Sequence, residues 1–84
     1  VLAAQTLPPE AIPHVQAGLA AQKQGRHDEA IAAFVRVAEL APNLAAAHVN
    51  LGNAYLQKGD YRKAIGPLRR SLELNPSLVG AHQM

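Results

Sequence analysis

The sequence contains no cysteine and no tryptophan, and its aromatic residues are one Phe and two Tyr. Without cysteine there are no disulfides, no thiolate metal sites and no cysteine nucleophile. No apolar run approaches the ~18–20 residues that a membrane-spanning helix needs. The opening VLAAQTLPP lacks a basic segment, so we expect no intact signal peptide there. None of these observations points to a particular compartment.

The charge of the chain is small: the net charge is +2 and the pI is about 9.4. Such a balance is weak evidence for a nucleic-acid partner. Five of the eight basic residues gather in one stretch, which Asp60 interrupts and Glu73 follows. Tyr61 is the only aromatic residue among these charges, whereas single-strand binding platforms stack successive bases on several aromatic side chains. We therefore interpret this stretch as a solvated face and expect no nucleic-acid partner. Its basic members are Lys58, Arg62, Lys63, Arg69 and Arg70.

What the chain does contain is alanine and an internal repeat. Residues 48–76 align without a gap on residues 14–42, and the offset is the same throughout (48 minus 14, 59 minus 25, 76 minus 42). Over the windows 11–44 and 45–78, 13 of 34 positions are identical. A fixed period of this length indicates an architecture of stacked supersecondary units. Alanine favours helices and lets them approach closely, so we expect an all-α fold of thin, closely packed helices.

The residues that repeat have a recognisable spacing. In the second copy they are Leu51, Gly52, Tyr55, Gly59, Ala64, Leu68 and Pro76, and in the first Ala17, Gly18, Ala21, Gly25, Ala30, Phe34 and Pro42. This spacing resembles the L-G-x-x-Y, A-x-x-x-F and closing P of the tetratricopeptide-repeat (TPR) family. The resemblance implies an α-solenoid of antiparallel helix hairpins, stacked with a right-handed superhelical sense. We expect a TPR unit over residues 11–44, a second over 45–78 and a truncated third over 79–84. Residues 1–10 would be an arm or the end of a preceding helix.

Local signals predict where the helices begin and end. We expect helices from 11 or 13 to 24, over 27–40, over 44–58 and over 61–74, and a fifth that begins at Ser77. Gly25 and Gly59 can adopt the positive φ of a helix C-terminus, and Asp60 is a good N-cap whereas Arg26 is a poor one. Asn43 is expected to cap the third helix. Pro67, in mid-helix, predicts a kink.

The small side chains predict where the helices touch. Gly18 and Gly52 on the first helix of each unit, and Ala30 and Ala64 on the second, are expected at close helix crossings. Ala17 and Ala21 extend the small-residue face of the first helix. All of these small residues are explained by helix packing, and none of them indicates a catalytic site.

Residues that suggest catalysis or metal binding have a simpler interpretation. His14, His48 and His82 recur at the repeat period, but neighbouring layers lie roughly 8–10 Å apart, too far for one zinc ion with ligands at ~2 Å. We interpret these histidines as packing residues. In His27-Asp28-Glu29 the side chains point apart on a helix. We therefore expect no enzyme activity, no metal and no cofactor.

The TPR resemblance implies that the first helix of each unit lines a groove for a protein or peptide partner. The groove lacks the Lys and Asn clamp of the chaperone-binding members, because Val15 and Leu19 occupy the first two clamp positions and only Asn50 matches. Asn50 and Asn53 also resemble the asparagines of O-GlcNAc transferase repeats. By position, the groove residues are Ile12, Val15, Gln16, Leu19, Gln22, Lys23, Ala46, Val49, Asn50, Asn53, Leu56 and Gln57.

A second hypothesis is structural. The expected fourth helix carries Ile65, Leu68 and Leu72 on a face that a further unit would cover. Left exposed, this face would pair with another copy of the chain, by end-to-end stacking or by exchange of the C-terminal stretch. The chain would then be a homo-oligomer.

Overall fold

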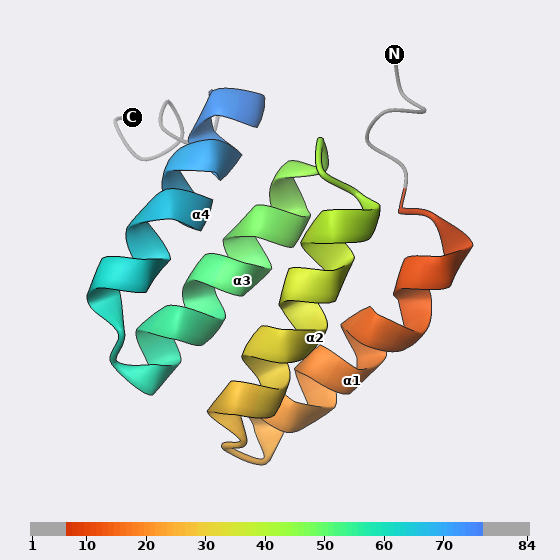
Figure 1. Cartoon of the computed structure of the whole chain (residues 1–84), viewed down its shortest axis with the longest axis vertical. Coiled ribbons are helices and arrows are strands. Elements are labelled where there is room, and N and C mark those ends of the chain that lie inside the picture. The colour runs from red at the N-terminus through yellow and green to blue at the C-terminus, as the bar shows by residue number, and fades with distance from the viewer. Residues whose placement is uncertain (1–6, 77–84) are drawn as a thin grey trace.

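A computed structural model describes residues 7–76, and all the regular structure in that range is helical (Figure 1). A single 3₁₀ turn, η2 (Pro9–Ala11), precedes α1 (Ile12–Lys23), α2 (His27–Leu40), α3 (Ala45–Lys58) and α4 (Tyr61–Leu74). The four predicted helices are confirmed, two of them with the same bounds and two within a residue or so. The helix predicted to begin at Ser77 lies outside the described residues.

The turn inside each hairpin is made by a glycine, as the sequence predicts. Gly25 has φ 74° and Gly59 has φ 90°, values that residues with a Cβ rarely adopt. The Asp60 carboxylate then accepts a hydrogen bond from the Lys63 N–H at 3.3 Å and caps α4. Arg26, at the equivalent place before α2, makes no such bond.

The turn between the hairpins differs from the prediction. Leu44, in extended conformation, is the N-cap of α3 and provides no side-chain hydrogen bond, so the prediction that Asn43 caps this helix is wrong. Instead, the His48 imidazole places Nε2 2.8 Å from the Pro42 carbonyl oxygen. The neutral Nε2–H tautomer can donate this bond, which ties the first turn of α3 to the connecting loop.

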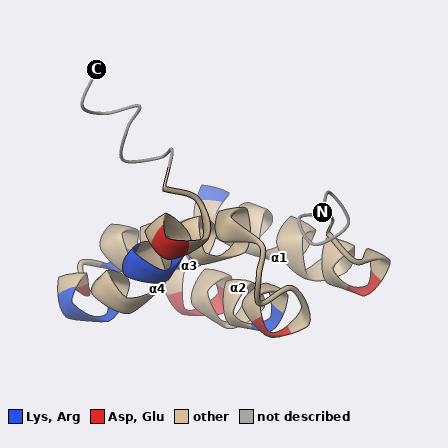
Figure 2. Ribbon diagram, turned by 90° about the horizontal axis from the view of Figure 1, so that it is seen from above, with Lys and Arg blue, Asp and Glu red and all other residues tan. Residues whose placement is uncertain are grey.

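The helices form two layers. Along the chain each helix packs on the next: α1 on α2, α2 on α3, and α3 on α4. Seen end-on, α1 and α3 lie on one side and α2 and α4 on the other (Figure 2). The shortest dimension, 19 Å against 32 and 29 Å, is that of two helix layers. One surface of the molecule is therefore built from α1 and α3 alone.

The small residues allow the helices of each hairpin to approach closely. A Cβ placed on Gly18 would lie 2.6 Å from the Phe34 ring, and one on Gly52 would lie 2.6 Å from the Leu68 side chain. Ala30 and Ala64 are also almost fully buried. Ala17, by contrast, is exposed, so its predicted place on the contact face of α1 is wrong.

The core that results is made mainly of alanine. In the described part of the chain the largest fully buried side chains are Phe34, then Val37, then the smaller Ser71. Ser71 occupies the position equivalent to Val37 in the second repeat, and its hydroxyl donates to the Leu68 carbonyl at 2.6 Å. A bond of this kind satisfies a buried hydroxyl within its own helix.

The helix α4 continues through Pro67 without a break in its assigned range. Proline has no N–H to bond the carbonyl one turn earlier, that of Lys63. The kink predicted here stays a prediction.

Candidate functional site

All twelve residues that the repeat positions predict for a groove belong to α1 or α3, and these two helices form one surface of the molecule (Figure 2). We call it the α1–α3 face. Eight of the twelve are exposed: Ile12, Gln16, Leu19, Lys23, Ala46, Asn53, Leu56 and Gln57. The other four, Val15, Gln22, Val49 and Asn50, are half-buried. Among these, Val15 also packs against the core, so its side chain supports the fold as well as the surface.

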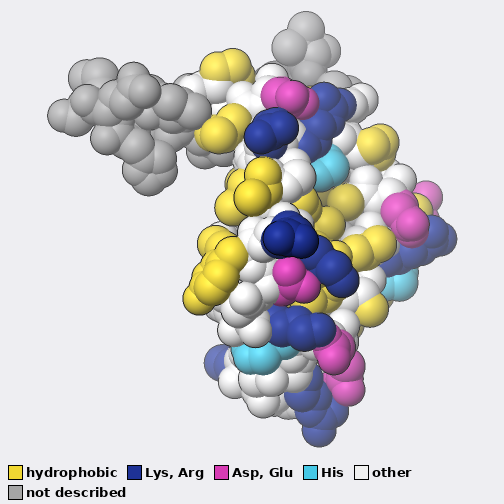
Figure 3. Space-filling model, turned by 60° about the vertical axis from the view of Figure 1, so that its left-hand side comes forward, with side chains coloured by type: hydrophobic (Ala, Val, Ile, Leu, Met, Phe, Trp, Pro, Cys, Tyr) yellow, Lys and Arg dark blue, Asp and Glu magenta, His cyan; other side chains and the backbone are white. Residues whose placement is uncertain are grey.

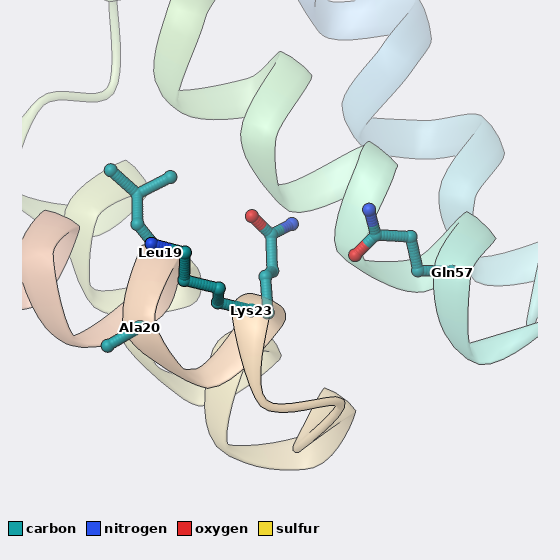
Figure 4. Close-up of a pocket in the computed structure, with 5 residues that line it drawn as sticks. Leu19, Ala20, Lys23 and Gln57 are labelled. Atoms are coloured by element: carbon teal, nitrogen blue, oxygen red, sulfur yellow. The ribbon is translucent and has the colours of Figure 1, made fainter.

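An open hollow of about 510 Å³ lies on this face, between the C-terminal turns of α1 and α3. Its lining combines one large apolar side chain, Leu19, with the amides of Gln22 and Gln57, the ammonium group of Lys23 and the methyl group of Ala20. Gln57 extends from α3 toward α1, and the Lys23 chain runs back along α1 toward Leu19 (Figure 4). The hollow thus offers amide groups and one cation beside an apolar surface.

The hollow brings together only four of the twelve predicted residues. Most of the others lie nearer the beginning of each helix, whereas Leu56 is close to the end of α3 but does not line the hollow. Ala20 lines the hollow but does not belong to the predicted set. Neither its size nor its polarity distinguishes it from the many other alanines, so the sequence offers no signal that selects it.

The two helices of this face contain no acidic residue. The six Asp and Glu of the chain are at positions 10, 28, 29, 39, 60 and 73, all outside α1 and α3. The only Lys or Arg residues in the two helices are Lys23 and Lys58, at their last positions. The ribbon coloured by charge shows the same separation, because α1 and α3 are almost free of colour (Figure 2).

Lys58 is already occupied by an ion pair. Its Nζ lies 2.6 Å from Oδ1 of Asp28, at the start of α2. The hydrogen bond from Lys58, together with its charge, lowers the pKa of Asp28, and the same bond raises the pKa of Lys58. The pair joins the end of α3 to the beginning of α2, next to the turn that connects α1 and α2.

The Asp28–Lys58 pair lies in a second open hollow of about 370 Å³, whose lining also includes His27. The side chains of the sequence His27-Asp28-Glu29 have separate surroundings. Asp28 binds Lys58, while Glu29 pairs with Arg26 at 3.6 Å. Nδ1 of His27 is buried and has no hydrogen-bond partner among the described residues. The three groups therefore do not form a relay in this arrangement.

The remaining titratable residues are the candidates for metal ligands. Across residues 7–76 there is no group of three or more His, Cys, Asp or Glu that could hold a metal ion. His48 is engaged with the Pro42 carbonyl, and His82 lies outside the described range. No helix within 7–76 combines the length and the hydropathy that crossing a bilayer requires.

The outer face of α4 is the other surface with exposed apolar side chains. Tyr61, Ile65 and Leu72 are exposed there. Leu68 is half-buried, and its side chain reaches Gly52 of α3. Its part in self-association stays a prediction. With α4 turned forward, hydrophobic side chains alternate with basic ones on that side (Figure 3). Tyr61 lies outside the predicted set, because the first position of a helix gives little signal of the face that its side chain joins.

Two helix hairpins that repeat at a fixed period and pack in one row define a helical-repeat protein. A family model described as Tetratricopeptide repeat matches residues 9–77. Because the match spans most of its length, the chain belongs to the tetratricopeptide-repeat family. Repeats of this family generally mediate protein–protein interactions and are typically non-catalytic. None of the curated proteins compared with the chain matches it significantly.

Proposed function

We propose that this chain is a non-catalytic interaction module that binds a peptide or a helix of another protein on the α1–α3 face. The repeat units that present this face are residues 11–44 and 45–78, and residues 79–84 begin a third. The observation that carries the proposal is the set of large apolar side chains left exposed on this face. Ile12, Leu19 and Leu56 are exposed, although the core itself is built mostly from alanine.

The polar residues of the face support the same function. Gln16, Gln57 and Asn53 are exposed and carry amides that both donate and accept hydrogen bonds. An extended peptide has unpaired backbone N–H and C=O groups, which such amides can satisfy. A helical partner would instead place its apolar side chains against Leu19 and Leu56, the helix-in-groove mode. Both modes use the same surface.

The proposal can be tested by selecting ligands from a displayed library of random 12-residue peptides. The selected peptides are then titrated with two variants, Leu19→Gln and Ile65→Gln. The pair is matched, because Leu19 is 51% exposed on the α1–α3 face and Ile65 is 54% exposed on α4. Both substitutions replace a branched aliphatic side chain with an uncharged amide at a site where folding does not depend on burial.

We expect Leu19→Gln to weaken the selected peptides about tenfold, since covering the exposed half of a leucine contributes ~1–1.5 kcal/mol. Ile65→Gln should leave their affinity unchanged. Equal losses in both variants, or a loss only in Ile65→Gln, would place the binding surface elsewhere. A library that yields no ligand would remove the proposal.

Self-association through α4 is a second candidate, and the repeat itself favours it. Ile31 of α2 is half-buried and packs against the core, whereas Ile65, its equivalent in the second repeat, is exposed. No described residue covers the face of α4 that carries Ile65. A second copy of the chain could occupy it, by stacking or by exchanging its C-terminal residues. Sedimentation velocity over a range of concentrations should then show a dimer that Ile65→Gln abolishes, and a strict monomer would exclude this candidate.

A further inference from the structure

We propose that the segment bound on the α1–α3 face is acidic as well as apolar, with one of its carboxylates placed at Lys23. This inference rests on the proposed function, and it adds the chemistry of the partner. It follows from how charge is distributed over the molecule rather than from the net charge, which is only +2.

Most of the basic residues in the described part of the chain are neutralised within it. Five of the eight form ion pairs, and each of these pairs uses a carboxylate from outside α1 and α3. The paired residues are Arg26, Arg36, Lys58, Lys63 and Arg70. Arg62 and Arg69, which are unpaired among the described residues, belong to α4.

Lys23 is therefore the one cation of the α1–α3 face without an ion pair inside the described range. No carboxylate of α1 or α3 competes for it, because these helices have none. A ligand carboxylate that arrives on this face meets an available ammonium group and no like charge. A basic ligand meets Lys23 and finds no carboxylate on either helix.

The surroundings of Lys23 also specify what accompanies the carboxylate. The stem of Lys23 lies along α1 toward Leu19, and Gln57 extends from α3 toward α1 across the same hollow (Figure 4). An apolar ligand side chain can cover Leu19 while a neighbouring carboxylate accepts from Lys23, and from an amide N–H of Gln22 or Gln57. A segment in which leucine-like residues alternate with Asp or Glu satisfies both requirements.

Phosphate groups of a nucleic acid are the other polyanionic ligand to consider. Nucleic-acid binding depends on several cations placed along one surface, and this face presents Lys23 alone as a cation unpaired within residues 7–76. The protein segment is therefore the ligand that the charges favour, and a single-stranded oligonucleotide becomes a control.

The experiment uses three fluorescein-labelled 16-residue peptides that share the same leucine positions. The remaining positions are filled with Glu in the first peptide, Gln in the second and Lys in the third. Fluorescence anisotropy measures their affinity for the full chain, for Lys23→Gln and for Arg62→Gln. The last variant is the matched control, because it removes one exposed positive charge, unpaired in the described range, from α4 instead.

We expect the Glu peptide to bind most tightly and the Lys peptide least tightly. Lys23→Gln should weaken the Glu peptide about two- to fivefold, the effect of one exposed ion pair, and should leave the Gln peptide unchanged. Added salt should remove this difference. Arg62→Gln should have no effect on either peptide.

Several results would overturn the inference. One is equal affinity for the Glu and Gln peptides, and another is an equal loss in Lys23→Gln and Arg62→Gln. A third is an oligonucleotide that binds more tightly than the Glu peptide and depends on Lys23. If the Gln peptide binds as tightly and depends on Leu19, the proposed function stands without the acidic preference. If no peptide binds and the display library yields none, both fall.

Discussion

Replacing Gly18 with alanine tests the packing on which the α1–α3 face depends. A Cβ at this position would lie 2.6, 2.7 and 3.0 Å from three atoms of the Phe34 ring. Carbon atoms are most favourably placed about 3.5–4.0 Å apart, so the two helices must separate or the ring must move. Phe34 is fully buried, so its ring cannot turn out into solvent. Overpacking of this kind costs about 1–3 kcal/mol, and the rigid ring places the cost near the upper limit.

Alanine also has an advantage, because it is a better helix former than glycine by about 1 kcal/mol. We therefore expect Gly18→Ala to lower the free energy of unfolding by about 2 kcal/mol. In a domain of this size that corresponds to a fall in Tm of roughly 8–16 °C. Urea unfolding followed by circular dichroism at low temperature measures the difference.

Two further variants separate the cost of overpacking from the gain in helix propensity. Ala32→Gly, at an exposed position within α2, reports the helix-propensity term alone and should cost about 1 kcal/mol. Gly52→Ala should cost less than Gly18→Ala, because the half-buried Leu68 side chain that it meets can rotate away. If Gly18→Ala is instead more stable than the wild type by the full propensity gain, α1 and α2 do not approach as closely as described.

The remaining predictions concern the turns and the ion pair between hairpins. Asp60→Ala removes the cap of α4 and should lower the free energy of unfolding by about 1 kcal/mol in urea titrations, whereas an unchanged midpoint would show that the Lys63 N–H is satisfied by water. Gly59→Ala forces a Cβ into φ 90° and should cost about 1–2 kcal/mol; an unaltered thermal midpoint would contradict that turn. Asp28→Asn should reduce stability near pH 7, and its difference from the wild type should vanish in acid. Because Lys58 lowers the pKa of Asp28, the pair's contribution is lost as the pH falls through that pKa, and it is lost again in alkali as Lys58 deprotonates. A difference that persists at low pH would rule out this pair as its cause.

Much of the fold was predictable because its signals are local. Gly25 and Gly59 end helices by their backbone freedom, and Asp60 begins one through its side chain, so the helix bounds follow from the residues themselves. The close approach at Gly18 was also predictable, since a position that recurs as glycine in two helices indicates contact.

The errors arose where a side chain has a choice of partners. Asn43 is a good capping residue, but the loop is instead held by His48, six residues after the carbonyl of Pro42 that it contacts. Leu68 has two possible places, because it follows the apolar spacing of the outer face and also packs into the space left by Gly52 of α3. Each outcome depends on contacts that form only when the helices are in place.

The candidate site was predictable as a surface but not as a shape. Repeat positions place twelve residues on α1 and α3, and these two helices lie on one side of the molecule. Where the surface is hollowed depends on how the ends of the two helices are placed relative to each other. That placement brings Leu19 and Lys23 near Gln57 and leaves Ile12 outside the hollow.

The most direct test of the proposed binding face is an NMR titration of the isotope-labelled chain with the Glu peptide, followed through its backbone amide signals. We predict that the signals that shift belong to α1 and α3, with the largest changes around Leu19, Lys23 and Gln57. Shifts confined to α2 and α4 would contradict the proposal that the α1–α3 face binds the partner.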